Sequence, residues 1–117
     1  MNKMELIKAK VIKEKLTGWS EAKIGLRIVI FLNVFTVETF TDKVISEFKE
    51  YLEENIGEVE RIRGYKFNPD GVVEAKFKKP GEAETCIQEM NEVEYNARVL
   101  KCFYWDGRQD YRRVTEI

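Results

Sequence analysis

Hydrophobic and polar positions alternate along the chain with two different periods, which predict four strands and two helices. Apolar residues recur every three or four positions after Thr41-Asp42 and again after Pro80-Gly81, as expected for two amphipathic helices. Before, between and after these helices lie apolar, β-rich runs bounded by turn residues. The predicted strands are residues 27–35, 58–67, 72–78 and 98–105. This β-α-β-β-α-β order predicts an α+β, ferredoxin-like sandwich, with two helices on one face of a four-stranded antiparallel sheet.

Two further patterns complete the predicted organisation. The sequence Asn-Pro-Asp-Gly at 68–71 is a strong turn signal, so we expect the second and third strands to form a hairpin. Residues 4–16 carry apolar side chains at roughly helical spacing, which predicts a short helix before the sheet. We therefore expect an N-terminal helix and linker over residues 1–22 and the main domain, with a short charged tail, over residues 23–117.

The sheet face turned away from the helices is predicted to lack the rings that bind RNA. The strand ending at Phe77 has the spacing of an RNA-recognition strand, but the base-stacking positions of such a sheet fall on Ile30, Val72 and Glu74. None of the three is aromatic, and the Glu74 carboxylate would repel phosphate. Since each base stack contributes roughly 1–3 kcal/mol, RNA binding on this face is not expected.

The same face would expose an apolar stripe along the first strand, from Ile28 to Leu32. Soluble monomers tend to avoid such patches, which leads to the hypothesis that a terminal segment covers this one. The N-terminal helix is the first candidate, and the tail after Trp105 is the second. We expect the Trp105 ring to pack this tail back onto the domain.

Composition excludes several classes of function. The 117 residues include 35% charged and 44% hydrophobic residues with a net charge of −1, which is typical of one soluble domain without the basic excess of many nucleic-acid binders. The chain has no histidine, and its two cysteines, Cys86 and Cys102, cannot complete a zinc site, so they are interpreted as reduced core thiols. No metal, cofactor or membrane span is expected. Without a nucleophile–base pair or a phosphate-binding glycine loop, we do not expect an enzyme.

One helix face is strongly acidic. Glu47, Glu50 and Glu54 are spaced three and four positions apart on the first predicted helix and therefore share a face. Such a face can simply be solvated, or it can bind a basic peptide. The spacing alone leaves both interpretations open.

Four segments, IVIFLNVF, NPDGVVEAKF, EAETCIQEM and YWDGRQDY, together resemble the UHM domains of splicing factors, in particular those of the Tat-specific factor group. UHM domains are relatives of the RNA-recognition motif, RRM, that bind peptides. The resemblance covers roughly residues 19–111. It implies capture of a disordered peptide, in which basic residues precede one tryptophan, in a pocket between the two helices and the following loop. The partner that it implies is the largest subunit of splicing factor three-b in the U2 snRNP, with a nuclear role in early spliceosome assembly.

The resemblance also implies which residues bind. The loop Val93-Glu94-Tyr95 corresponds to the Arg-any-Phe motif of the family, so Tyr95 would stack on the peptide tryptophan. Val93 replaces the arginine and so removes a cation from the pocket. Glu47 is the best match to the acidic helix position that receives the basic residues, with Glu50 and Glu54 as further candidates.

A second hypothesis is a single-stranded RNA binder that uses loops and the basic tail instead of the sheet. The cations available for this function are Lys76, Lys78, Lys79, Arg108, Arg112 and Arg113. The missing rings and the net charge argue against it, so we expect RNA contact to be weak or indirect and the domain to act as a monomer.

Overall fold

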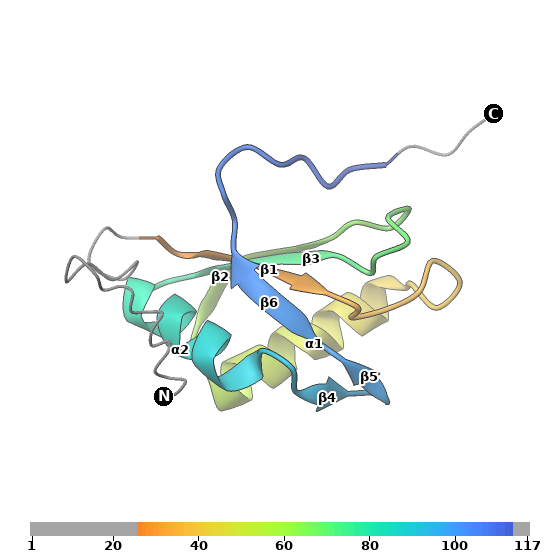
Figure 1. Cartoon of the computed structure of the whole chain (residues 1–117). Coiled ribbons are helices and arrows are strands. Elements are labelled where there is room, and N and C mark those ends of the chain that lie inside the picture. Colours follow the sequence, from red (N-terminus) through yellow and green to blue (C-terminus); the bar gives the residue numbers. More distant parts are fainter. Residues whose placement is uncertain (1–25, 114–117) are drawn as a thin grey trace.

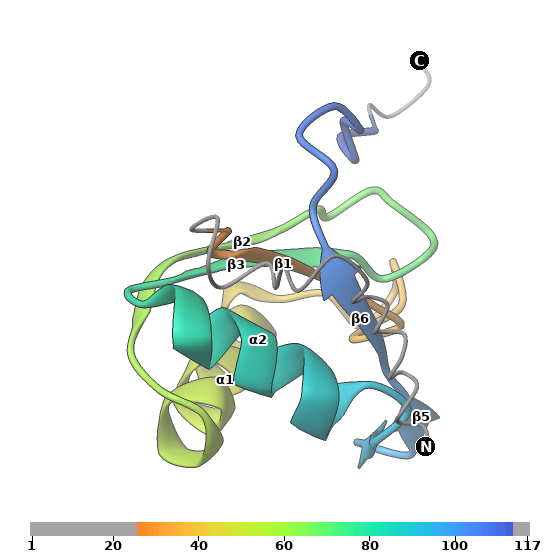
Figure 2. The ribbon, with the colours of Figure 1, turned by 60° about the vertical axis from the view of Figure 1, so that its left-hand side comes forward.

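The computed structural model describes residues 26–113 and contains the predicted sandwich (Figure 1). Its elements are β1 Ile28–Leu32, α1 Asp42–Asn55, β2 Val59–Gly64, β3 Val73–Phe77, α2 Pro80–Met90, β4 Glu94–Tyr95, β5 Arg98–Val99 and β6 Lys101–Tyr104. Four strands form one antiparallel sheet in the order β2-β3-β1-β6, and β4 pairs with β5 separately. Both helices cover the same face of the large sheet (Figure 2). The predicted N-terminal helix lies outside the described residues.

Both helices begin where the sequence predicts. Thr41 is the N-cap of α1, and its Oγ1 accepts a hydrogen bond from the Val44 amide at 3.0 Å. This bond satisfies one of the amides that the first turn of a helix leaves without a partner. Pro80 opens α2, where the missing N–H of proline costs nothing.

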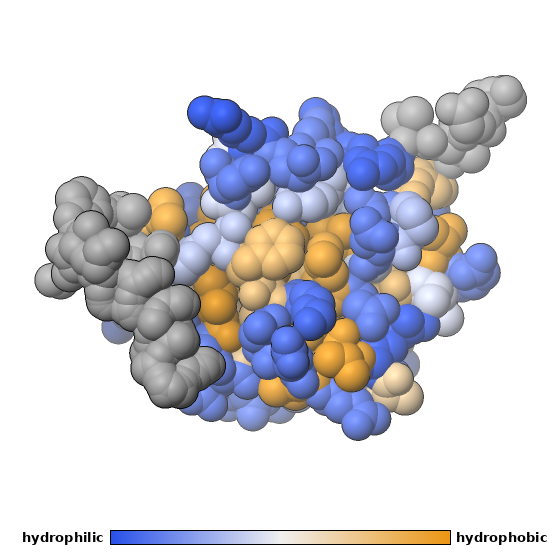
Figure 3. All heavy atoms as spheres, viewed as in Figure 1, coloured by the Kyte–Doolittle hydropathy of each residue, from blue (hydrophilic) through white to orange (hydrophobic). Residues whose placement is uncertain are grey.

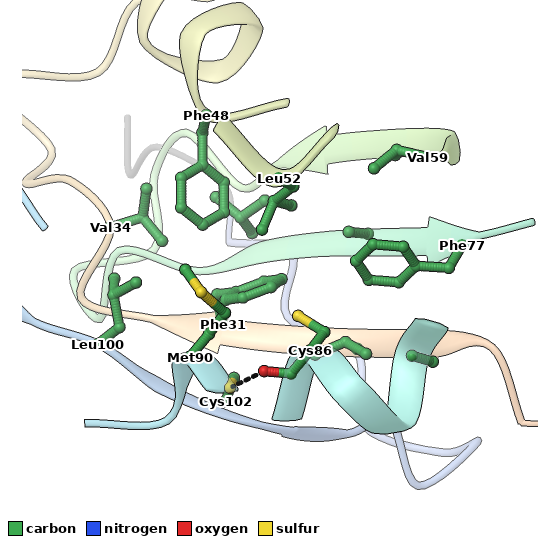
Figure 4. Packing of buried hydrophobic residues seen from close by; sticks show 14 of the residues in the cluster. Phe31, Val34, Phe48, Leu52, Val59, Phe77, Cys86, Met90, Leu100 and Cys102 are labelled. Atoms are coloured by element: carbon green, nitrogen blue, oxygen red, sulfur yellow. Dashed lines mark hydrogen bonds between the residues drawn. The ribbon is translucent and has the colours of Figure 1, made fainter. Parts of the chain in front are cut away.

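The core lies between the helices and the sheet, and the predicted alternation of strand residues is confirmed. Val29 and Phe31 of β1 point toward the helices and pair with Ala75 and Val73 of β3. The Phe31 ring meets the Phe48 ring of α1 edge-on, with 5.0 Å between centroids (Figure 4). These side chains are fully buried, so the layer is held mainly by apolar contact.

The two cysteines are core residues, as predicted. Cys86 of α2 and Cys102 of β6 are both buried and free, and Cys102 Sγ lies 3.9 Å from the carbonyl oxygen of Cys86 (Figure 4). The neighbouring Cys102 thiol and burial raise the pKa of the Cys86 thiol. The thiolate is therefore suppressed, and Cys86 behaves as a small apolar side chain.

The turn at 68–71 forms and joins β2 to β3 as predicted. The Gly71 amide donates to the Asn68 carbonyl at 3.1 Å, and the Asp70 amide donates to Asn68 Oδ1 at 2.9 Å. Gly71 has a φ of +65°, a left-handed conformation that glycine adopts without a Cβ clash.

The predicted strands are longer than those of the structure. The first ends at Leu32 instead of residue 35, and the third is one residue shorter at each end. The second ends at Gly64 instead of residue 67, because the chain turns there, and the Asn68 amide donates to the Tyr65 carbonyl at 3.0 Å. The last strand is divided into β5 and β6 at Leu100, whose amide donates to the Val93 carbonyl at 2.9 Å. This division lets β4 and β5 form a small hairpin beside the main sheet.

Candidate functional site

The Tyr95 ring packs against the aromatic side of α1. It lies on β4 and is half-buried, with its centroid 4.8 Å from that of Tyr51 and 5.1 Å from that of Phe48. Burial raises the pKa of the Tyr95 hydroxyl, and the nearby Glu47 carboxylate and Tyr51 raise it further. The ring therefore stays neutral. Glu47 is four residues before Tyr51 on α1, so it lies on the same side of the helix as the ring that Tyr95 contacts. The structure thus brings together two of the predicted site residues.

The acidic residues of α1 are exposed along the helix. Glu47, Glu50 and Glu54 all face solvent, and Glu47 lies 3.8 Å from Lys43 in an exposed ion pair. Such a pair is weak and leaves Glu47 available to another cation. Because Glu54 is seven residues after Glu47, it lies about 10 Å further along the axis, so the three carboxylates form a row along α1.

Val93 and Glu94 precede Tyr95 in the turn after α2. Val93 is half-buried, and its backbone amide donates to the Met90 carbonyl at 3.2 Å. Glu94 is exposed. Val93 thus contributes backbone bonds that shape the loop, but no charge beside Glu47.

Asn33 anchors the β4–β5 hairpin and was missed by sequence reasoning. Its Nδ2 donates to the Val99 carbonyl at 3.0 Å, and Arg98 Nη1 donates to its Oδ1 at 3.2 Å. Asn33 has a φ of +73°, a conformation in which asparagine is enriched. An asparagine directly after an apolar strand was the available signal. Through these bonds, the end of β1 helps to fix where Tyr95 lies.

The rings beside Tyr95 leave little room between them. An indole sandwiched between two parallel rings needs about 7 Å between them, twice the usual carbon–carbon contact distance. Tyr51 and Tyr95 are only 4.8 Å apart and tilted by 49°. A planar ligand must therefore separate the two rings or stack on a face of Tyr95 that Tyr51 leaves free.

The opposite face of the sheet is partly covered by the C-terminal tail. Figures 1 and 2 show this tail on the side away from the helices. Trp105 and Tyr111, together with Tyr65, pack over Ile30 and Val72, whose side chains are fully buried. The second candidate of the sequence hypothesis is thus the segment seen to cover this face. The first candidate lies outside the described residues.

Hydrogen bonds hold the tail in this position. Asn68 Nδ2 donates to the Tyr111 carbonyl at 2.9 Å, and Trp105 Nε1 donates to the Gln109 carbonyl at 2.8 Å. Hydrophilic residues gather over the tail at the top of Figure 3, with a band of hydrophobic residues below it. The tail therefore presents polar groups to solvent while Trp105 and Tyr111 turn inward.

The predicted absence of stacking rings needs one correction. Glu74 accepts a hydrogen bond from the Tyr65 hydroxyl at 2.7 Å, so this carboxylate is already used within the sheet. Phe103, however, pairs directly with Ile30 across β1 and β6, which places its ring on the same face, with 38% exposed. Phe103 lies on the last strand of the sheet, whereas the stacking positions were predicted on the first and third strands alone.

The six cations of the RNA-binding alternative lie in two groups. Lys76 lies on β3 and Lys78 and Lys79 follow it, and two of these lysines pair with glutamates at 3.6 and 3.7 Å. Those at 108–113 lie in the tail, where Arg112 Nη2 is 2.6 Å from Asp110 Oδ2. Hydrogen bonds from Arg112 lower the pKa of the Asp110 carboxyl to about 2.

The described range, residues 26–113, contains neither a metal-binding cluster nor a membrane-spanning helix. In this range, no three histidine, cysteine or acidic side chains are grouped so that they could hold a metal ion. None of its helices has the length and apolar character needed to cross a membrane.

Comparison with known proteins gives two kinds of similarity. The 17S U2 SnRNP complex component HTATSF1 of Mus musculus is 32% identical over 91 residues, which is 74% of this chain, and the Homo sapiens protein gives the same values. The chain spans only 12% of the length of these relatives. No protein-family model matches the chain.

Solved structures support the fold alone. The third RRM domain of Hrb1 superimposes with a TM-score of 0.56 at 20% identity, covering 74% of this chain and 80% of that domain. The third RRM domain of Mip6 gives a TM-score of 0.57 at 12% identity, covering 75% of this chain and all of that domain.

Proposed function

Because this chain is an RNA-recognition-motif domain that resembles a segment of the U2 snRNP component HTATSF1, we propose that it is a nuclear splicing-factor domain that binds a tryptophan-containing peptide. The peptide carries basic residues before its tryptophan and belongs to a U2 snRNP protein, for which the largest subunit of splicing factor three-b is the first candidate. The domain acts by binding, as a monomer, and its role is to assist early spliceosome assembly.

The observation that carries this proposal is the position of Tyr95 beside the acidic side of α1. A half-buried ring supported by Tyr51 and Phe48 offers a rigid surface for an indole. The Glu47 carboxylate lies close enough to influence the Tyr95 hydroxyl. A peptide with a tryptophan and a nearby cation matches both groups at once.

The acidic residues further along α1 extend this surface. Glu50 and Glu54 are exposed and point to the same side as Glu47 by helical spacing. Several basic residues of an extended peptide can therefore each meet a carboxylate. Since these carboxylates are exposed, we expect them to affect association rate and salt dependence more than total affinity.

The covered sheet face also favours binding on the helix side. Ile30 and Val72 are fully buried beneath Trp105 and Tyr111, so the usual base-stacking surface of this fold is occupied. Binding at Tyr95 requires no movement of the tail.

Calorimetric titration with a basic peptide containing one tryptophan tests the proposal. Tyr95→Ala should weaken binding at least tenfold, because removal of an aromatic anchor typically costs about 2 kcal/mol or more. Tyr95→Phe keeps the ring and should stay within about twofold of the unchanged chain. Peptide binding that survives in Tyr95→Ala would overturn the assignment.

The acidic surface is tested separately by charge reversal. Glu47→Lys should weaken the same peptide about two- to fivefold, since exposed ion pairs contribute about 0.5–1 kcal/mol. Glu58→Lys is the matched control, because this side chain is 65% exposed and lies beyond the C-terminal end of α1. Equal effects of the two reversals would mean that only net charge matters.

A further inference from the structure

The first 25 residues, which precede the described part of the chain, have the composition of a ligand for the site at Tyr95. Five lysines and two glutamates come before Trp19, and the last two of these lysines are Lys13 and Lys15. The segment is therefore basic and ends its run of cations just before a tryptophan. This is the same order of groups as in the peptide proposed to bind at Tyr95.

Trp19 is the tryptophan of this chain that such a site could bind. The chain has two tryptophans, and the other, Trp105, packs over Ile30 in the C-terminal tail. The Trp105 indole Nε1 already donates to the Gln109 carbonyl at 2.8 Å. An indole that reaches Tyr95 from this chain must therefore be that of Trp19.

The lysines match the row of carboxylates along α1 in sign and in length. Glu47 and Glu54 are exposed and lie about 10 Å apart along the helix axis. Lys15 is four residues before Trp19, so an extended chain places it at most about 14 Å from the tryptophan. With the indole at the Tyr95 ring, the lysines before it can therefore lie along this row.

The distance to Tyr95 favours a second copy of the chain over the same molecule. Trp19 is seven residues before Leu26, so it lies at most about 25 Å from the first described residue. From Leu26, the chain runs about 23 Å through β1 to Asn33, which bonds to the β4–β5 hairpin that carries Tyr95. Figure 1 shows this hairpin at the far end of β1 from the first described residues. Capture within one molecule would need a fully extended connection on a straight path, whereas capture between two copies has no such limit.

We propose, as an extension that rests on the proposed function, that the domain without its peptide partner binds the N-terminal segment of a second copy. Trp19 of one copy then lies on Tyr95 of the other. Because each copy has one segment and one site, mutual exchange closes a two-fold dimer. The segment and the peptide partner compete for the same site, so the peptide-bound domain is the monomer proposed above.

Sedimentation velocity on the full chain tests this exchange. The unchanged chain and Tyr95→Phe should form dimers as the concentration rises, whereas Trp19→Ala and Tyr95→Ala should each stay monomeric. An equimolar mixture of Trp19→Ala and Tyr95→Ala should form a weaker one-to-one complex, because one variant supplies the site and the other supplies the tryptophan. A monomeric unchanged chain, a Trp19→Ala variant that still dimerises, or a mixture without any complex would overturn the proposal.

Calorimetry on the Trp19→Ala chain, whose site has no competing tryptophan, separates this proposal from the proposed function. The probes are a peptide of residues 8–21 of this chain and the same peptide with Trp19→Ala. We expect the first to bind at least tenfold more tightly, as for the loss of an aromatic anchor. If an unrelated basic peptide with one tryptophan binds and the peptide of residues 8–21 does not, self-association fails and the proposed function stands. If neither tryptophan peptide binds, both proposals fail.

The lysines are tested in the same peptide. Lys13→Gln with Lys15→Gln should weaken binding about two- to fivefold, since exposed ion pairs are weak. Lys8→Gln with Lys10→Gln removes the same charge at positions nine or more residues before Trp19, beyond the row of carboxylates, and should have a smaller effect. Equal losses in both peptides would show attraction by net charge alone and would contradict the position of the lysines along α1.

Discussion

At the scale of single residues, Tyr65 links the sheet to the tail. Its hydroxyl donates to Glu74 at 2.7 Å, while its ring lies 6.0 Å from that of Tyr111. It fills part of the face where RNA-binding relatives of this fold would present stacking surface. The Tyr65 side chain therefore gives the Glu74 carboxylate a hydrogen-bond donor and also supports the C-terminal tail through Tyr111.

The environment of the Tyr65 hydroxyl leads us to expect a loss of stability at high pH. Burial, together with the bond to Glu74, raises the pKa of its hydroxyl above the ordinary value of 10.0. Because this pKa is higher in the folded state than in the unfolded state, Tyr65 stabilises the fold fully below its unfolded-state pKa. That stabilisation is lost as the pH rises through the folded-state pKa. Thermal unfolding between pH 7 and 11 should show a shallower decline for Tyr65→Phe than for the unchanged chain. If the stability of both proteins declines in parallel, other tyrosines control stability in this pH range.

Val93 provides a second prediction, which rests on the proposed peptide site. Val93→Arg restores a cation close to the acids of α1 and should strengthen binding of the basic tryptophan peptide two- to fivefold, or about 0.5–1 kcal/mol. The new arginine would repel the basic peptide, since both are positively charged. The expected gain therefore comes from its pairing with the carboxylates of α1, which orders the pocket. Val93→Gln has similar length without charge and should show no gain in calorimetry. Equal affinities of the two variants would contradict a role for the missing arginine.

At the scale of elements, the β2–β3 hairpin depends on one glycine. A Cβ at Gly71 would meet the Phe35 carbonyl oxygen and the Phe35 amide nitrogen, and its φ is +65°. Gly71→Ala should therefore lower the free energy of unfolding by about 1–3 kcal/mol, measured by urea denaturation. Gly81→Ala is the control, because its Cβ would meet nothing within 4 Å at the start of α2. It should leave stability unchanged or raise it by up to about 1 kcal/mol. An unchanged free energy of unfolding in Gly71→Ala would mean that the turn can shift to accommodate a Cβ.

Elements defined by local chemistry could be predicted from the sequence. Thr41 caps α1 and the turn at 68–71 closes a hairpin because the relevant donors and acceptors are neighbours in the chain. The division of the last strand was not predictable in this way. It depends on Asn33, which bonds to Val99 66 residues later, and no local pattern reveals such a partner.

The same distinction applies to the candidate site. The resemblance to a known family suggested Tyr95 and the acids of α1, and in the structure the Tyr95 ring packs on Phe48 and Tyr51 of that helix. Sequence reasoning missed that Tyr51 would close on the Tyr95 ring, since β4 is only two residues long and is positioned by tertiary contacts. It also missed Phe103, because the face of a short strand depends on its register with β1.

At the scale of the whole molecule, the tail acts as a third layer over the sheet. Helices cover one face and residues after β6 cover part of the other, so β1 has buried side chains on both faces. This arrangement explains why Ile30 and Val72, apolar residues on the nominally open face, are compatible with a soluble domain.

Removing the anchor of this layer should expose the sheet. Tyr111→Ala is expected to lower the free energy of unfolding by about 1–2 kcal/mol, a part of the value of burying an aromatic side chain. Amide hydrogen exchange should become faster in residues 28–32 and 72–74 and remain unchanged in α1. Val37→Ala, at a side chain that is 39% exposed, is the control and should alter neither region. Unchanged exchange in Tyr111→Ala would mean that the tail does not protect the sheet.

Asn68 has a consequence for the order of folding. It is the buried polar residue whose Oδ1 accepts from Asp70 within the turn, while its Nδ2 donates to the Tyr111 carbonyl 43 residues later. The bond within the turn holds the amide group in the orientation that directs its Nδ2 to the tail. We therefore expect the tail to dock last, in a kinetic phase that follows hairpin formation, so that a chain emerging during synthesis would complete its sheet before closing over it.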